Sequence, residues 1–275
     1  VYEIKTPDAH ATEALEARYI EATGELLIVW DDQYPSVSNG LRRIRWLWSS
    51  VEGEMTGSDT YTVFDGGLGN QRLADVDVFS DGGFVVTWDD DAGDVDGFSA
   101  KARIFEVDGS PTSDQLALNR DGAGDQTTPG VAVLAGDEWV TAFADDSGRV
   151  WTRRYDREGV DAVGQLEHTA NATTGGAQQE LSGGQAQGGE VFLAWSSPFA
   201  GNSGSEIVGR RIDHTGASIT AETQVNTTMS GVQSHPSVAA LNQGWLTLWQ
   251  SSSSTALGVE VIGRWVDATG TPTGA

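Results

Sequence analysis

The stretch Gly82-Gly-Phe-Val-Val-Thr-Trp88 decides the fold, because variants of it recur along the whole chain. Each variant is a short apolar run that ends in an aromatic residue, and the aromatic ends are spaced 58, 55, 52 and 54 residues apart. Self-similarity at a nearly constant period indicates a repeat architecture, and five such units fill the 275 residues. The runs are Gly24–Trp30, Gly83–Trp88, Glu138–Phe143, Gly189–Trp195 and Gly244–Trp249.

Two further elements keep the same place in the units. An Arg stands six residues before a Gly at Arg103, Arg153, Arg210 and Arg264, while Leu47 stands there in the first unit. A Gln stands 16 or 17 residues before the aromatic end at Gln71, Gln126, Gln178 and Gln233, while Glu13 takes this position in the first unit. Three elements in one order make accidental similarity improbable.

Each unit contains segments for four short strands, and no segment has a sustained 3.6-residue period. The sequence therefore predicts an all-β fold, a five-bladed β-propeller with four-stranded antiparallel blades in a single domain, 1–275. The blades are expected at about 11–65, 66–120, 121–170, 171–227 and 228–275.

The fifth unit ends before a fourth strand is evident, and Tyr2-Glu-Ile-Lys5 resembles the missing strand. We expect residues 1–10 to supply the outer strand of the last blade, with Tyr2–Ile4 pairing with Glu260–Val266. Such pairing closes the ring and removes an open sheet edge that invites aggregation.

The charge of the chain excludes several partners. With 16 Lys and Arg against 40 Asp and Glu, the net charge is −24, so a nucleic acid partner is not expected. No apolar run is long enough for membrane insertion.

The composition is that of a folded protein without disulfides. Cysteine is absent, and a hydrophobic content of 38% with ten Trp is sufficient for a core. The chain starts at Val1 without Met or a leader, as expected of a processed piece.

The best-formed repeats resemble a known family. Gly82–Trp88 and Val225–Pro236 are similar to the propeller-forming repeats of large secreted bacterial surface proteins. The five-bladed architecture is also similar to that of tachylectin-type lectins and of five-bladed glycosidases. The resemblance implies a secreted or cell-surface location, and a monomer or a part of a longer chain.

Acidic clusters follow the aromatic strands, and one of them suits a cation. Asp89, Asp91, Asp94 and Asp96 alternate along a loop that ends in Gly97, and calcium prefers such oxygen ligands. A calcium site in this loop is one hypothesis, although no cofactor is required by the sequence. Solvated turn residues of an acidic protein are the alternative.

The repeated polar residues allow two interpretations. Glu13, the four Gln and the four Arg can build equivalent ligand pockets, or they can tie the blades together. Trp151 and Trp265 lie on the strand that carries the Arg, where exposed rings can stack on sugars or fill the core.

The main functional prediction is a binding or adhesion module without enzymatic activity that recognises a glycan or a cell-surface polysaccharide. The alternative is a glycoside hydrolase, which needs two carboxyl groups on either side of the scissile bond. Its candidates on or near the first strands of the blades are Glu13, Glu16, Asp75, Asp77 and Glu180. A structural spacer in a larger surface protein is a second alternative.

Overall fold

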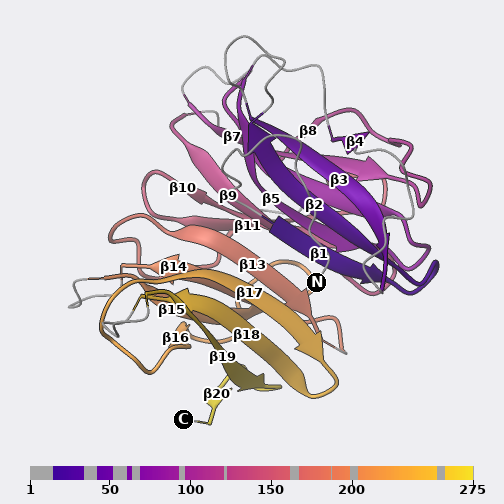
Figure 1. The fold of residues 1–275 in the computed structure, drawn as a ribbon. Helices are drawn as coiled ribbons and strands as arrows, with labels where there is room; N and C mark the ends of the chain where they lie inside the picture. Colours follow the sequence, from indigo (N-terminus) through magenta and orange to yellow (C-terminus); the bar gives the residue numbers. More distant parts are fainter. Residues whose placement is uncertain are drawn as a thin grey trace. The chain divides into compact units, whose positions relative to one another are not determined.

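A computed structural model describes residues 15–33, 42–51, 61–63, 69–92, 97–120, 123–161, 167–186, 188–198, 204–252 and 258–274. These ranges contain strands and no helix. The strands form five antiparallel sheets, each built from four strands that follow one another along the chain (Figure 1). The prediction of an all-β, five-bladed β-propeller is confirmed.

The strands are as follows. Blade 1 has β1 (Leu15–Ile20), β2 (Glu25–Gln33), β3 (Arg42–Ser50) and β4 (Tyr61–Thr62). Blade 2 has β5 (Gln71–Val78), β6 (Phe84–Asp90), β7 (Ser99–Phe105) and β8 (Leu116–Ala117). Blade 3 has β9 (Gln126–Val133), β10 (Trp139–Asp145), β11 (Val150–Tyr155) and β12 (His168–Thr169). Blade 4 has β13 (Gln179–Gln185), β14 (Val191–Ser197), β15 (Glu206–Ile212) and β16 (Thr223–Gln224). Blade 5 has β17 (Gln233–Leu241), β18 (Gly244–Ser251), β19 (Glu260–Asp267) and β20 (Pro272–Thr273).

The chain divides into two compact units, Val1–Pro129 and Gly130–Ala275, with the boundary inside β9. We call them unit 1 and unit 2. A core cluster of unit 1 surrounds Trp46 and Trp88, and clusters of unit 2 surround Trp195 and Trp245. The aromatic residues that end the second strands are all buried, and each contributes roughly 2–3 kcal/mol by leaving water. They are Trp30, Trp88, Phe143, Trp195 and Trp249.

In blades 3 to 5, an Asp three residues before the repeated Gly forms the turn after the third strand. In blade 5, the Asp267 carboxylate accepts hydrogen bonds from the backbone amides of Thr269 and Thr271 and from the Thr269 hydroxyl. These bonds, that of the Thr269 hydroxyl above all, hold the pKa of Asp267 below its ordinary value. Gly270 closes the turn at a φ of 83°, in the left-handed region that glycine adopts without strain.

The last strand of blade 5 is β20, which pairs with β19 through Trp265 with Thr273 and Val266 with Pro272. The pair Val266–Pro272 has the place of the bridges Phe105–Pro111, Tyr155–Asp161 and Ile212–Ser218 in blades 2 to 4, whose own fourth strands come later along the chain. Residues 1–14 lie outside the described residues. Closure of the ring by residues 1–10 therefore stays a prediction.

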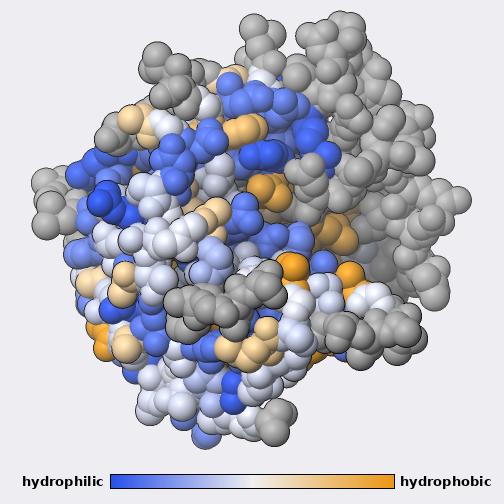
Figure 2. All heavy atoms as spheres, turned by 90° about the vertical axis from the view of Figure 1, so that its left-hand side faces the viewer, coloured by the Kyte–Doolittle hydropathy of each residue, from blue (hydrophilic) through white to orange (hydrophobic). Residues whose placement is uncertain are grey.

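The surface agrees with an acidic and polar composition. On the face shown in Figure 2, hydrophilic and weakly polar residues cover most of the coloured surface, and hydrophobic residues occur in small groups. Within the described part of the chain, no helix has the length and apolarity needed to cross a membrane.

Candidate functional site

The four Gln residues of the repeat are buried and hydrogen-bonded inside their blades. In blades 4 and 5, the Gln178 and Gln233 side-chain oxygens accept hydrogen bonds from the indoles of Trp195 and Trp249, at 2.8 and 2.9 Å. In blade 3 the second strand ends in Phe143, whose side chain has no N–H, and Gln126 accepts a hydrogen bond from Asn119, in the segment that connects blade 2 to blade 3. These contacts support the structural interpretation of this position, as does the full burial of Gln71. Glu13 lies outside the described residues.

The Arg residues of the repeat bind backbone carbonyls of the preceding blade. Arg103 Nη1 donates to the Val63 carbonyl at 2.7 Å, and Arg210 Nη1 donates to that of Ala170, also at 2.7 Å. Arg264 Nη1 donates in the same way to Val225 at 2.6 Å. Arg153 forms an ion pair with Asp161 at 2.6 Å. The hydrogen bonds of Arg103, Arg210 and Arg264 support the interpretation that the repeated Arg connects neighbouring blades.

The two candidate sugar-stacking rings have different surroundings. Trp151 is half-buried, and its indole donates to Asp145 at 2.8 Å. Trp265 is exposed on β19.

The candidate calcium ligands are only partly described. Asp91 accepts hydrogen bonds from the Asn70 amide groups, while Asp94 and Asp96 lie outside the described residues. Within the described ranges, no group of three potential metal ligands occurs. Calcium at this loop stays a prediction.

Asp89 is a buried carboxyl group on β6. Its Oδ2 lies 3.4 Å from Nε of Arg72, whose guanidinium stacks on the Phe98 ring at 3.8 Å. Burial raises the pKa of Asp89 to about 7, and the charge of Arg72 offsets this only in part. Because the carboxyl is fully buried, it is a stability element rather than a ligand contact.

The carboxylates of the hydrolase alternative converge in unit 1. Arg18 on β1 lies between them, with Nη1 2.9 Å from Glu16 Oε2 and Nη2 3.1 Å from Asp75 Oδ1. Its Nε lies 3.9 Å from Asp77 Oδ1. The first strands of blades 1 and 2 thus bring three acids and one base together. We call these four residues the Arg18 cluster.

The strand period explains this convergence. Residues two apart in a strand point to the same face, so Glu16 and Arg18 share one face of β1, and Asp75 and Asp77 share one face of β5. Arg18 was not a candidate from the sequence, because it lies outside the repeated Arg position. The alternation of charged residues on β1 and β5 was the available signal.

Negative charge exceeds positive charge within the Arg18 cluster. Burial lowers the pKa of Arg18, but the charges of Asp75, Glu16 and Asp77 together outweigh it and raise the pKa above its ordinary value. Three carboxylates against one guanidinium leave a net charge of about −2 when all are ionised. Such a site favours positive charge on a bound molecule.

Glu180, the remaining hydrolase candidate, lies in unit 2. Its carboxylate accepts a hydrogen bond from the His235 backbone amide at 2.6 Å and lies 3.2 Å from His235 Nε2. The pair joins β13 and β17, the first strands of blades 4 and 5. His235 was not a candidate from the sequence.

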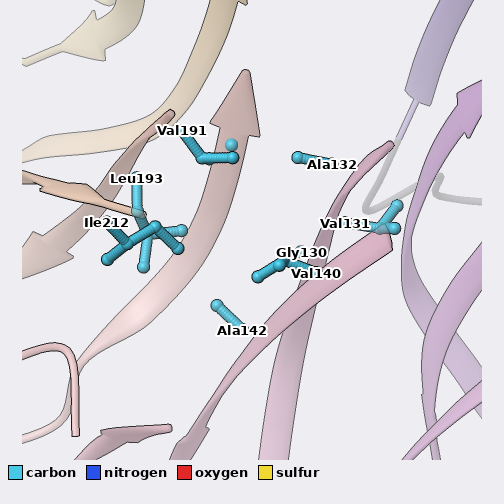
Figure 3. Close-up of a pocket in the computed structure, with 9 residues that line it drawn as sticks. Gly130, Val131, Ala132, Val140, Ala142, Val191, Leu193 and Ile212 are labelled. Carbon is cyan, nitrogen blue, oxygen red and sulfur yellow. The ribbon is translucent and has the colours of Figure 1, made fainter. Parts of the chain in front are cut away.

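The pocket in Figure 3 offers no binding chemistry. Its walls are apolar, and in the close-up Val191, Leu193 and Ile212 lie across from Ala132 and Ala142. The space has room for about one water molecule. It is a packing defect between β-strands of unit 2.

Comparisons with known proteins identify solved structures of similar fold. No family model and no curated protein matches the sequence. A protein of unknown function from Dyadobacter fermentans DSM 18053 is similar with a TM-score of 0.67 and 10% identity, over 94% of this chain and 80% of that chain. The GH43 endo-arabinanase from Bacillus licheniformis has a TM-score of 0.55 and 12% identity, over 91% and 93%. CoXyl43, a GH43 β-xylosidase/α-arabinofuranosidase from a compost microbial metagenome, has a TM-score of 0.58 and 12% identity, over 97% and 95%.

At such identities the likeness shows the fold, and the resemblance to bacterial surface repeats stays a prediction. The comparisons nevertheless correct the main functional prediction. Similar structures with a named activity include GH43 enzymes, which favours the glycoside hydrolase alternative over a module without enzymatic activity. Two of the similar structures were solved with bound sugars, xylotriose in one and β-1,3-galactotriose in the other. The prediction of a binding module assumed ligand pockets built by the repeated Gln and Arg residues. In the structure, these side chains form hydrogen bonds and ion pairs with other residues of the protein.

Proposed function

We propose that this protein hydrolyses glycosidic bonds of a polysaccharide, with Glu16 and Asp77 as the two carboxyl groups that act on the scissile bond. The observation that carries the proposal is the convergence of Glu16, Asp75 and Asp77 on Arg18. The shared fold with GH43 glycosidases supports it.

The positions of Glu16 and Asp77 suit two carboxyl groups that act on a glycosidic bond from opposite sides. Glu16 and Asp77 are both partly accessible, with side-chain exposures of 27% and 25%. Since both carboxylates contact one rigid guanidinium, the contacting oxygens are no more than about 9 Å apart. Glycosidases separate their two carboxyl groups by roughly 5 to 10 Å, and the upper limit for this pair lies inside that range.

The chemistry follows from this arrangement. One carboxyl group protonates the leaving glycosidic oxygen, and the other activates water or attacks the anomeric carbon. The sugar becomes cation-like in the transition state, and the excess negative charge of the Arg18 cluster stabilises that cation. Asp75 is the least exposed of the three acids, at 8%, and holds Arg18 in place.

The test is hydrolysis of arabinan, xylan and galactan fragments and of aryl glycosides by the wild type and by Glu16→Gln and Asp77→Asn. We expect each substitution to lower kcat at least about 100-fold, because a carboxamide cannot transfer the proton. Glu21→Gln is the matched control, since Glu21 is exposed in the turn after β1. If both variants retain the wild-type rate, or if no substrate is cleaved, the proposal is wrong.

Two further features belong to the same proposal. The resemblance of Gly82–Trp88 and Val225–Pro236 to repeats of secreted bacterial surface proteins supports a secreted or cell-surface enzyme, where polysaccharides are accessible. Calcium at the loop that carries Asp91, Asp94 and Asp96 is an accessory proposal, tested by the effect of a chelator on the melting temperature. An unchanged melting temperature with and without added calcium would contradict it.

A further inference from the structure

A strained backbone position recurs in the first strands of four blades. Two residues after each repeated Gln, a residue other than glycine has a positive φ. The φ values of these four residues lie between 52° and 58°. We call these the bulge positions, because the pairing of β5, β13 and β17 shifts register around them. They are Leu73, Thr128, Glu180 and His235.

A side chain at positive φ costs of order 1 kcal/mol, and glycine avoids that cost. None of the four positions is glycine, so each side chain either offsets the strain through its contacts or is present for a function other than stability. Thr128 is buried and Leu73 is half-buried, so packing offsets the strain in unit 1.

The bulge positions of unit 2 differ, because their side chains remain accessible. The exposed fractions of the His235 and Glu180 side chains are 47% and 21%. Glu180 contacts both the backbone amide and the imidazole of His235, so one carboxylate fixes the position of the ring. The fixed ring still presents about half of its surface to solvent. Packing alone does not require an ordered but accessible imidazole.

We propose that His235, held by Glu180, contacts a sugar residue of a polysaccharide that binds to unit 2. This inference rests on the proposed function and adds a contact in unit 2. Because Nε2 faces the Glu180 carboxylate, a neutral imidazole donates its N–H to Glu180 and leaves Nδ1 to accept a hydrogen bond from a sugar hydroxyl group. Pre-positioning by Glu180 lowers the entropy that binding costs.

Other classes of ligand fit less well. The Glu180 carboxylate and the net charge of −24 repel a phosphate or a carboxylate. In the part of the chain that the structure describes, no third potential metal ligand accompanies the pair, so a metal ion lacks its usual ligand number. A neutral, hydroxyl-rich ligand remains.

The first experiment compares the kinetics of the wild type with His235→Gln and Glu180→Gln on the best substrate. We expect KM to rise about 10-fold, with kcat within about 3-fold, because the contact binds the substrate and does not transfer a proton. His214→Gln is the matched control, since His214 is an exposed histidine on a turn of the same unit. An unchanged KM in both variants, or a large loss of kcat alone, overturns the proposal.

The second experiment separates this inference from the proposed hydrolysis. The chain has four histidines, so the imidazole signals in an NMR spectrum can be assigned with His235→Gln. Titration with arabino-, xylo- and galacto-oligosaccharides should shift the His235 signals and leave those of His214 unchanged. Hydrolysis without any shift at His235 refutes the contact alone, whereas a shift without hydrolysis supports the contact and refutes the enzyme.

Discussion

The Arg18 cluster in unit 1 and the Glu180–His235 pair in unit 2 use the same kind of strand in different ways. Both lie on the first strands of neighbouring blades. Arg18 is a largely buried cation shared by three acids, whereas His235 is a half-exposed ring with a single acidic partner. The first group should therefore support both stability and chemistry, while the second should affect ligand binding with little effect on stability.

Removing Arg18 tests the stability side of this comparison and should have the largest effect. Arg18→Met removes one cation from the nearly buried Asp75, while the charges of Glu16 and Asp77 stay close to it. We expect a loss of about 3 kcal/mol in the free energy of unfolding, or of about 6–12 °C in Tm. His235→Gln should change Tm by less than about 2 °C. Urea unfolding measures both, and equal effects of the two substitutions would contradict the comparison.

Asp89 shows a third arrangement, in which an Arg only partly offsets the burial of an acid. Its pKa is raised from an ordinary value near 3.8 to about 7. Asp89 therefore favours the folded state fully below about pH 4, and this contribution is lost as the pH rises through about 7.

Asp89→Asn should remove this pH dependence, because the amide stays neutral at every pH. Between pH 4 and 8, we expect the free energy of unfolding of the variant to rise relative to the wild type by about 2 to 4 kcal/mol. Chemical unfolding at several pH values measures the difference. Parallel pH profiles of the two proteins would show that Asp89 is not protonated in the folded state.

The sequence predicts the repeated parts of the fold well, because every blade needs them. Aromatic ends fill the blades, and Arg103, Arg210 and Arg264 bind the preceding blade, so a constant spacing reveals them. The sequence does not reveal β20, because this strand has only two residues and contains Pro272.

The sites were harder to predict, because they depend on residues that differ between blades. Arg18 has no counterpart in the repeat, and its acids are few among 40 Asp and Glu. The bulge positions carry Leu, Thr, Glu and His, so no glycine marks the positive φ. The common feature is their distance from the repeated Gln, which becomes informative only once the backbone angles are known.

Glycine substitutions at and beside the bulge position of blade 5 are a further test, and they should change the free energy of unfolding the least. His235→Gly relieves a side chain at a φ of 52° and loses only a solvent-exposed ion pair. We therefore expect the free energy of unfolding to stay within about 0.5 kcal/mol of the wild type or to rise slightly. Ser234→Gly is the matched control one residue earlier, where φ is not positive, and should lose about 1 kcal/mol.

The two glycine variants together decide why His235 is present. If His235→Gly is as stable as the wild type but binds the oligosaccharide more weakly, the side chain serves the ligand and not the fold. If it is destabilised by more than Ser234→Gly, then Glu180 and His235 hold β13 and β17 together, and unit 2 resembles the Arg18 cluster after all. The bulge would in that case be a structural joint between blades 4 and 5, with its strain offset by the contact that crosses it.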